Sequence, residues 1–257
     1  MFFSLLLLFN LTSENPSIKK VEETLISKHK PLPIAEMSIL KEQMIVYFNP
    51  ELNNINVSYT TTKADVGLLK NELKAGLLAG VVSMDSIKAA FANHLVNKII
   101  PHWYGTPWSF GGHTEVPNQG KIACGYFIST TLRDMGIKLN RYKLAQKSPI
   151  DEAKVISCGT EITTIQEETY EKAIEEIDRI TKDGIYFIGF DEGHVGYLLK
   201  QKGELFLVHS NYFAPVSVTI EAIQTSRAFK SFSKFYIVDI SNNDILLQRW
   251  LDNVIVL

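Results

Sequence analysis

The pattern of apolar and polar residues divides the chain into a helical first part and a strand-rich last third. Between residues 63 and 100, apolar side chains recur at spacings of three and four, which is the period of an amphipathic helix. This pattern predicts two helices, the second of which is capped by Ser83 or Asp85 and ended by Pro101. The residues predicted to face inward are Leu68, Leu69, Leu73, Leu77, Leu78 and Val81 in the first helix, and Ile87, Ala90, Phe91, Leu95, Val96 and Ile99 in the second.

Two more helices are predicted in the middle of the chain. The segment 122–136 has a stripe of apolar side chains and ends at Gly136, which favours helix termination. A second helix is expected from about Thr164 to Thr181, with its isoleucines on one side. Residues 137–183 form a long insertion between the conspicuous Cys124 and the strands that follow.

The last third of the chain has the character of β-structure. Its apolar runs are short and are separated by glycine-containing connectors, one of which, 201–203, predicts a tight hairpin. Helices followed by an antiparallel sheet predict an α+β fold. The predicted strands are 184–190, 194–199, 204–209 and 235–240, and a short helix is expected at 245–251.

The amino-terminal end carries an apolar run of eleven residues, which is too short to cross a bilayer, since a span needs about 20 residues. Its length suits the core of a secretory signal, although no Lys or Arg precedes it. We expect a signal peptide over 1–15 and therefore an exported protein, periplasmic or extracellular. Without the signal, the chain would be cytoplasmic. The expected domains are this segment, an N-terminal extension over 16–100 that is helical from 63, and an α+β domain over 101–257.

Composition narrows the class of protein. The 257 residues carry 26 basic and 28 acidic side chains, and 46% are hydrophobic. A near-neutral balance argues against nucleic-acid binding, and we expect no stable membrane insertion. The two cysteines, Cys124 and Cys158, are too few for a disulfide scaffold or a four-thiolate zinc site. A compact enzyme or binding domain remains, and nothing indicates its oligomeric state.

Cys124 lies where a glycine-rich loop passes into a predicted helix. The positive end of a helix dipole and the unpaired N–H groups of its first turn stabilise a thiolate, so we expect a lowered pKa and a nucleophilic sulfur. The same N–H groups can hold an oxyanion. Gly125, directly after the cysteine, leaves the sulfur unobstructed. The alternative is a cysteine that only packs in the core.

Two histidines lie on the predicted hairpin. His194 opens its first strand and His209 closes its second. A turn that pairs Lys200 with Gly203 places His194 opposite His209, whereas a turn centred one residue further along places it opposite Asn211. Either polar neighbour would fix the tautomer of His194, as a catalytic base requires.

A metal site is a weaker interpretation of the same residues. Cys124, His194 and His209 are side chains that zinc accepts. The chain has no His-Glu-x-x-His or Cys-x-x-Cys spacing, and no phosphate-binding loop of the GxxxxGK type. We therefore expect neither a metal nor another cofactor.

The order of a helix-heading cysteine, a histidine on one strand and a polar residue on the next resembles the papain-like fold. The local sequence resembles the NlpC/P60 branch of the cysteine peptidases. Residues 104–112, Tyr-Gly-Thr-Pro-Trp-Ser-Phe-Gly-Gly, are similar to that family's aromatic and Gly-Gly loop. Residues 122–126, Ile-Ala-Cys-Gly-Tyr, stand in the place of its Asp-Cys-Ser-Gly segment. Residues 193–198 and 208–210 resemble its His-Val-Gly strand and the strand after it.

The resemblance implies roles for particular residues. Cys124 would be the nucleophile, His194 the base and His209 the residue that orients the base. Tyr104 matches a tyrosine near the substrate and the oxyanion. Trp108 would join it in a platform for peptide or sugar, or pack in the core as aromatic residues commonly do. Gly125 follows the nucleophile at the substrate site.

The function implied is a cysteine peptidase or amidase that hydrolyses a peptide or amide bond through a thioester. The family acts on peptidoglycan, so the expected substrate is a peptide or muropeptide. Two departures bear on specificity, because Ala123 replaces the family's Asp and Gly125 its Ser. The alternatives are an acyltransferase, which passes the acyl group to an amine or alcohol, and a papain-like module that only binds.

Overall fold

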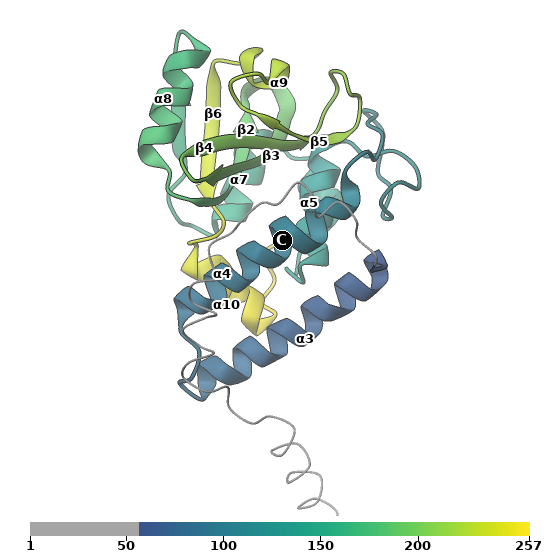
Figure 1. The fold of residues 1–257 in the computed structure, drawn as a ribbon, viewed down its shortest axis with the longest axis vertical. Coiled ribbons are helices and arrows are strands. Elements are labelled where there is room, and N and C mark those ends of the chain that lie inside the picture. Colours follow the sequence, from purple (N-terminus) through teal and green to yellow (C-terminus); the bar gives the residue numbers. More distant parts are fainter. Residues whose placement is uncertain (1–56) are drawn as a thin grey trace, which may run out of the picture. The chain divides into compact units, whose positions relative to one another are not determined.

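The structure, a computed structural model, describes residues 57–257, all of which belong to one compact unit. These residues form helices and a six-stranded antiparallel sheet, which confirms the predicted α+β class (Figure 1). The expected signal peptide over 1–15 and the extension up to residue 56 lie outside the described residues. No helix within 57–257 combines the length and the apolar character that a membrane span requires.

The first two helices begin at serine caps. In α3 (Tyr59–Leu78), Ser58 accepts a hydrogen bond from the N–H of Thr61, and Ser83 caps α4 (Met84–His94) as predicted. A π-helical segment (Leu95–Ile99) and a 3₁₀ turn (Ile100–Trp103) continue α4 through Pro101. The predicted inward residues of α4 are buried except Ala90, which is partly exposed.

The predicted leucine stripe of α3 is confirmed only in part, because Leu73 and Leu77 pack against the core but the members at either end do not. Leu68 and Leu78 are 63% and 80% exposed, and the buried residues of the helix are Thr62, Val66 and Lys70. Leu68, Leu73 and Leu78 are five residues apart, which turns each by about 140° from the one before, so these three cannot share one face. Lys70 is accommodated because its Nζ donates to Asn253 Oδ1 at 2.7 Å and to the Gly136 carbonyl at 3.3 Å.

The sheet has the strand order β1–β6–β2–β3–β4–β5. All four predicted strands are present, but β1 and β5 were not predicted. Thr163–Gln166 was expected to begin a helix; it pairs instead with β6, and α8 (Tyr170–Ile180) begins at a Thr169 cap. The strands are β1 (Thr163–Gln166), β2 (Gly184–Phe190), β3 (His194–Gln201), β4 (Glu204–Ser210), β5 (Val218–Ala222) and β6 (Lys234–Asp239).

The β3–β4 hairpin adopts the second of the two expected registers. Gln201 pairs with Glu204, and the two turn residues between them, Lys202 and Gly203, have φ angles of 53° and 77°. Positive φ at both positions is the type I′ geometry that suits a two-residue hairpin. Continued along β3, this register places His194 level with Asn211.

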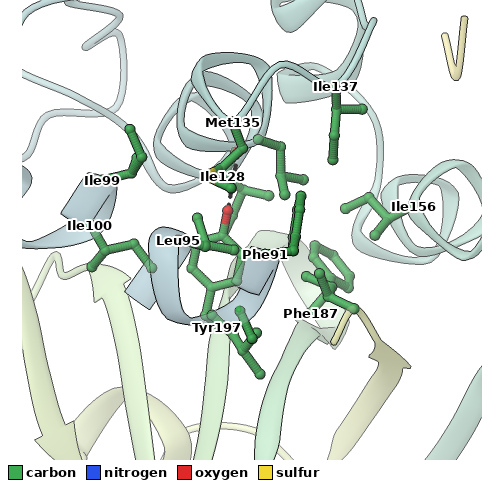
Figure 2. Close-up of a cluster of buried hydrophobic side chains, with 14 of the residues drawn as sticks. Phe91, Leu95, Ile99, Ile100, Ile128, Met135, Ile137, Ile156, Phe187 and Tyr197 are labelled. Carbon is green, nitrogen blue, oxygen red and sulfur yellow. Dashed lines mark hydrogen bonds between the residues drawn. The ribbon is translucent and has the colours of Figure 1, made fainter. Parts of the chain in front are cut away.

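Helices cover both faces of the sheet (Figure 1). On one face, α4, α5 (Cys124–Asp134), α7 (Pro149–Ser157) and α10 (Asp244–Asp252) share a core with the sheet, in which Phe91 and Leu95 lie near Tyr197 (Figure 2). On the other face, α8 and α9 (Arg227–Lys230) pack against Leu198 and Leu207. The Tyr197 hydroxyl also contacts Thr131 Oγ1 at 2.7 Å, so α5 is fixed against β3.

Candidate functional site

Helix α5 begins at Cys124, and its cap is unlike those of the other α-helices. The capping residue, Ala123, has no side chain that could bond to the first turn. In the described part of the chain, every other α-helix has such a cap, from Ser58, Ser83, Asn140, Ser148, Thr169, Ser226 or Asn243. No side-chain cap therefore occupies the first-turn N–H groups beside the Cys124 sulfur.

The segment before Cys124 is held by backbone and side-chain hydrogen bonds. Ser210, at the end of β4, donates to the Ile122 carbonyl at 2.7 Å, and the N–H of Ala123 donates to Gly112 at 2.8 Å. These bonds link the loop to the sheet. They place the first turn of α5 beside the start of β3.

The Cys124 thiol is half-buried, and burial raises its pKa to about 11. Hydrogen bonds from the backbone of Val195 and Gly125 act in the opposite direction, and the nearby Glu152 carboxyl raises the pKa further. The expected lowering by the helix terminus is therefore wrong for the resting protein, because burial outweighs it. At neutral pH the sulfur carries its proton.

His194 begins β3, one residue before Val195, whose backbone contacts the Cys124 sulfur. The His194 ring lies 5.2 Å from that of Tyr212, whose pKa the cysteine also influences. Burial, with a smaller contribution from His209, holds the pKa of His194 well below its usual value. The imidazole is therefore neutral at neutral pH and can accept a proton.

His209 is the polar neighbour that contacts His194. Nε2 of His194 and Nδ1 of His209 are 2.8 Å apart, and both rings are buried. The two residues are diagonal neighbours in the sheet, a position that long side chains can bridge. Asn211 lies level with His194, but its Oδ1 accepts a hydrogen bond from the N–H of Phe213 at 2.8 Å.

Two further residues extend this pair, and neither was predicted. The carboxylate of Glu221 on β5 lies 3.2 Å from His209 Nε2, and Ser226 Oγ donates to the same oxygen. The alternation of Val-Thr-Ile-Glu-Ala over 218–222 is the signal that could have revealed the strand. Thr219 pairs with His209, so Glu221 lies one diagonal step away on the same strand.

The three residues expected to bind substrate are placed differently from one another. The ring of Trp108 lies 6.0 Å from the ring of Tyr212, which in turn lies 5.2 Å from the His194 ring. Tyr104 packs against the core, and burial raises the pKa of its hydroxyl. Gly125 is buried in the interior, and a Cβ there would lie 2.7 Å from the Ala145 carbonyl oxygen.

Close packing at Gly125 leads to a prediction. We expect Gly125→Ala to lower the free energy of unfolding by about 1–3 kcal/mol, because the added methyl group overlaps backbone that can yield only if α5 and α6 (Arg141–Ala145) separate. Urea denaturation measures the change. The matched control is Gly67→Ala in α3, where nothing lies within 4 Å and the helix should gain about 0.5–1 kcal/mol. Equal stabilities of the two variants would contradict the packing.

Glu152 is a buried carboxyl close to the nucleophile. It is 2% exposed, and its Oε2 has no hydrogen-bond partner among the described residues. Burial raises its pKa well above the usual value. Between pH 4.5 and its raised folded pKa, such a group is protonated in the folded state and ionised in the unfolded chain. The free energy of unfolding therefore falls as pH rises through this range.

We therefore expect Glu152→Gln to become more stable relative to the parent chain as pH rises. The difference in the free energy of unfolding should grow by about 1.4 kcal/mol per pH unit from pH 4.5 until the folded pKa is reached. Urea denaturation of both chains at several pH values measures it. A difference that does not change with pH would show that this carboxyl titrates normally.

Within 57–257, no three His, Cys, Asp or Glu side chains are arranged to hold a metal ion. Both cysteines are free thiols, and Cys158 lies at the end of α7.

No known protein family matches the chain, and no curated protein or solved structure shows a significant similarity to it.

Proposed function

We propose that the protein is a papain-like cysteine hydrolase, similar to the NlpC/P60 branch, that cleaves a peptide or amide bond through a thioester. One observation carries the proposal. The sulfur of a cysteine at an uncapped helix N-terminus bonds to the backbone of Val195, and the preceding residue, a neutral His194, is hydrogen-bonded to His209 at 2.8 Å. A nucleophile, a base and an orienting group are the three parts that such catalysis needs.

The architecture supports the papain-like assignment. Helix α5 packs on an antiparallel sheet, His194 opens the adjoining strand β3, and His209 lies on the next strand. The chain order of nucleophile, base and orienting residue is that of the unpermuted papain-like enzymes. The insertion 137–183 contributes α6, α7, β1 and α8 to this scaffold.

In the proposed mechanism, the resting pair is a neutral thiol and a neutral imidazole. As the sulfur attacks the carbonyl carbon, His194 takes the thiol proton, and the first-turn N–H groups of α5 hold the oxyanion. The intermediate collapses when the imidazolium gives that proton to the leaving amine, which leaves the acyl group on sulfur. His194 then takes a proton from water, and the resulting attack releases the carboxylic acid and restores the thiol.

The proposed substrate is a peptide or muropeptide met after export. Trp108 and Tyr212 offer ring faces near His194 against which such a chain could lie. Ala123 provides no carboxylate at the first turn, so recognition of a substrate amine there must differ from that of the peptidoglycan enzymes.

A two-part experiment tests the proposal. The folded chain is mixed with p-nitrophenyl acetate, and we expect a burst of one p-nitrophenol per chain followed by slower turnover. Purified muropeptides and unrelated peptides are then incubated with the protein and weighed by mass spectrometry, with and without an added amine. Cleavage by water supports a hydrolase, whereas products that contain the amine indicate acyl transfer. Absence of a burst would favour a binding module.

A further inference from the structure

We propose that Glu221, anchored by Ser226, is a positioning residue that sets the tautomer of both histidines and so leaves Nδ1 of His194 free to act as the base. The inference rests on the proposed function. It adds two residues on β5 and at the start of α9 that no resemblance assigned. Hydrogen bonds connect Ser226, Glu221, His209 and His194 in that order.

Ser226 orients the carboxylate. Its Oγ accepts a hydrogen bond from the N–H of Phe229 at 3.0 Å as the cap of α9, so its own proton is available to donate. That proton goes to Oε1 of Glu221, at 2.5 Å. Ser226 is fully buried, which holds the carboxylate in one position against the edge of the hairpin.

The Glu221 carboxylate is ionised, so it accepts hydrogen bonds but cannot donate one. Burial acts to raise the pKa of its carboxyl, but the hydrogen bonds from His209 and Ser226 outweigh burial and lower the pKa below its usual value. An ionised carboxylate has no proton to give. The 3.2 Å contact with His209 therefore requires the proton to be on Nε2 of His209.

The tautomer of His209 determines that of His194. Burial lowers the pKa of His209, so a neutral ring with its proton on Nε2 has a bare Nδ1 that can only accept. The 2.8 Å contact then requires the proton of His194 to be on Nε2. Among residues 57–257 the His194 ring forms no other hydrogen bond, so its Nδ1 keeps a free lone pair for the thiol proton.

Without the carboxylate, the direction of this chain is not fixed. His209 could then carry its proton on Nδ1 and donate to Nε2 of His194. The His194 proton would move to Nδ1, and the base would lose the lone pair that accepts the Cys124 proton. A wrong tautomer of the base is costly, by roughly 10²–10⁴-fold in rate.

The test compares Glu221→Gln with Glu204→Gln, a matched change of an exposed carboxylate on the neighbouring strand β4. Two-bond ¹H–¹⁵N correlation spectra report which imidazole nitrogen carries a proton, and p-nitrophenyl acetate reports the rate of acylation. In the parent chain and in Glu204→Gln, we expect both histidines to be protonated on Nε2. In Glu221→Gln we expect a substantial Nδ1–H population at His194 and acylation slower by roughly 10-fold or more.

The outcomes separate this inference from the proposed function. Unchanged tautomers in a folded Glu221→Gln would overturn the role of Glu221, even if acylation slowed. If the parent chain is not acylated at all, the proposed function fails, but the spectra still decide whether Glu221 sets the tautomers. Should Glu221→Gln not fold, Ser226→Ala, which keeps the carboxylate and removes its anchor, must show a smaller shift in the same direction. Unchanged spectra there would overturn the role of the anchor and the inference with it.

Discussion

Replacement of Cys124 by alanine should abolish both the burst and the turnover of p-nitrophenyl acetate, and the remaining rate should equal that of the buffer. The proposed reaction passes through a bond to this sulfur, so no other group can replace it. The variant should fold, because the change removes a single sulfur atom and the segment before α5 is held by the bonds from Ser210 to Ile122 and from Ala123 to Gly112. Stopped-flow absorbance of the released p-nitrophenol measures the burst.

The chain provides its own control for this prediction. Cys158 is also a free, half-buried thiol, but it lies at the end of α7, where its Sγ contacts the Val155 carbonyl at 3.7 Å. Cys158→Ala should keep the full burst. A burst that survives in Cys124→Ala, or one that disappears in Cys158→Ala, would show that Cys124 is not the nucleophile.

Replacement of His194 by glutamine should slow acylation of Cys124 by about 10²–10⁴-fold, the usual contribution of a general base. It should also change the pH profile. Because the pKa of His194 lies well below 6.5, the parent rate should stay level above that pH and fall only in acid, where the base becomes protonated. In His194→Gln the rate should instead follow the thiolate and rise about tenfold per pH unit toward pH 11.

The matched control for this change is His102→Gln. His102 lies in the 3₁₀ turn after α4, where its Nε2 contacts Thr62 Oγ1 at 2.9 Å. A glutamine can keep a polar partner for that hydroxyl, so acylation and its pH profile should not change. Identical pH profiles of His194→Gln and the parent chain would remove His194 from the role of base.

The elements that local pattern defines were predictable from the sequence. The four strands with continuous apolar runs, the Ser83 cap and the β3–β4 hairpin all depend on neighbouring residues. Strand β1 was not predictable in this way, because Thr163–Gln166 is a short edge strand defined by its pairing with β6, and the five-residue alternation of β5 (Val218–Ala222) is a weak local signal for the other edge strand. Tertiary contacts of this kind override local preference.

The candidate site was predictable in part. The sequence allowed two hairpin registers, and the positive φ angles of Lys202 and Gly203 belong to the one that makes His209 a diagonal neighbour of His194. The contact between His209 and Glu221 depends on β5, so it could not be predicted without first predicting that strand. The pKa of Cys124 is raised by burial in the folded protein, and spacing along the sequence does not reveal burial.

The most direct test of the central claim is to trap the acyl group on the protein. The parent chain is mixed with p-nitrophenyl acetate, quenched in acid during the burst, digested and mapped by mass spectrometry. We expect one acetyl group per chain, carried as a thioester by Cys124, removed by hydroxylamine and absent from Cys158. A folded chain whose Cys124 remains unmodified while p-nitrophenol is released, or whose label lies on another residue, would contradict the account.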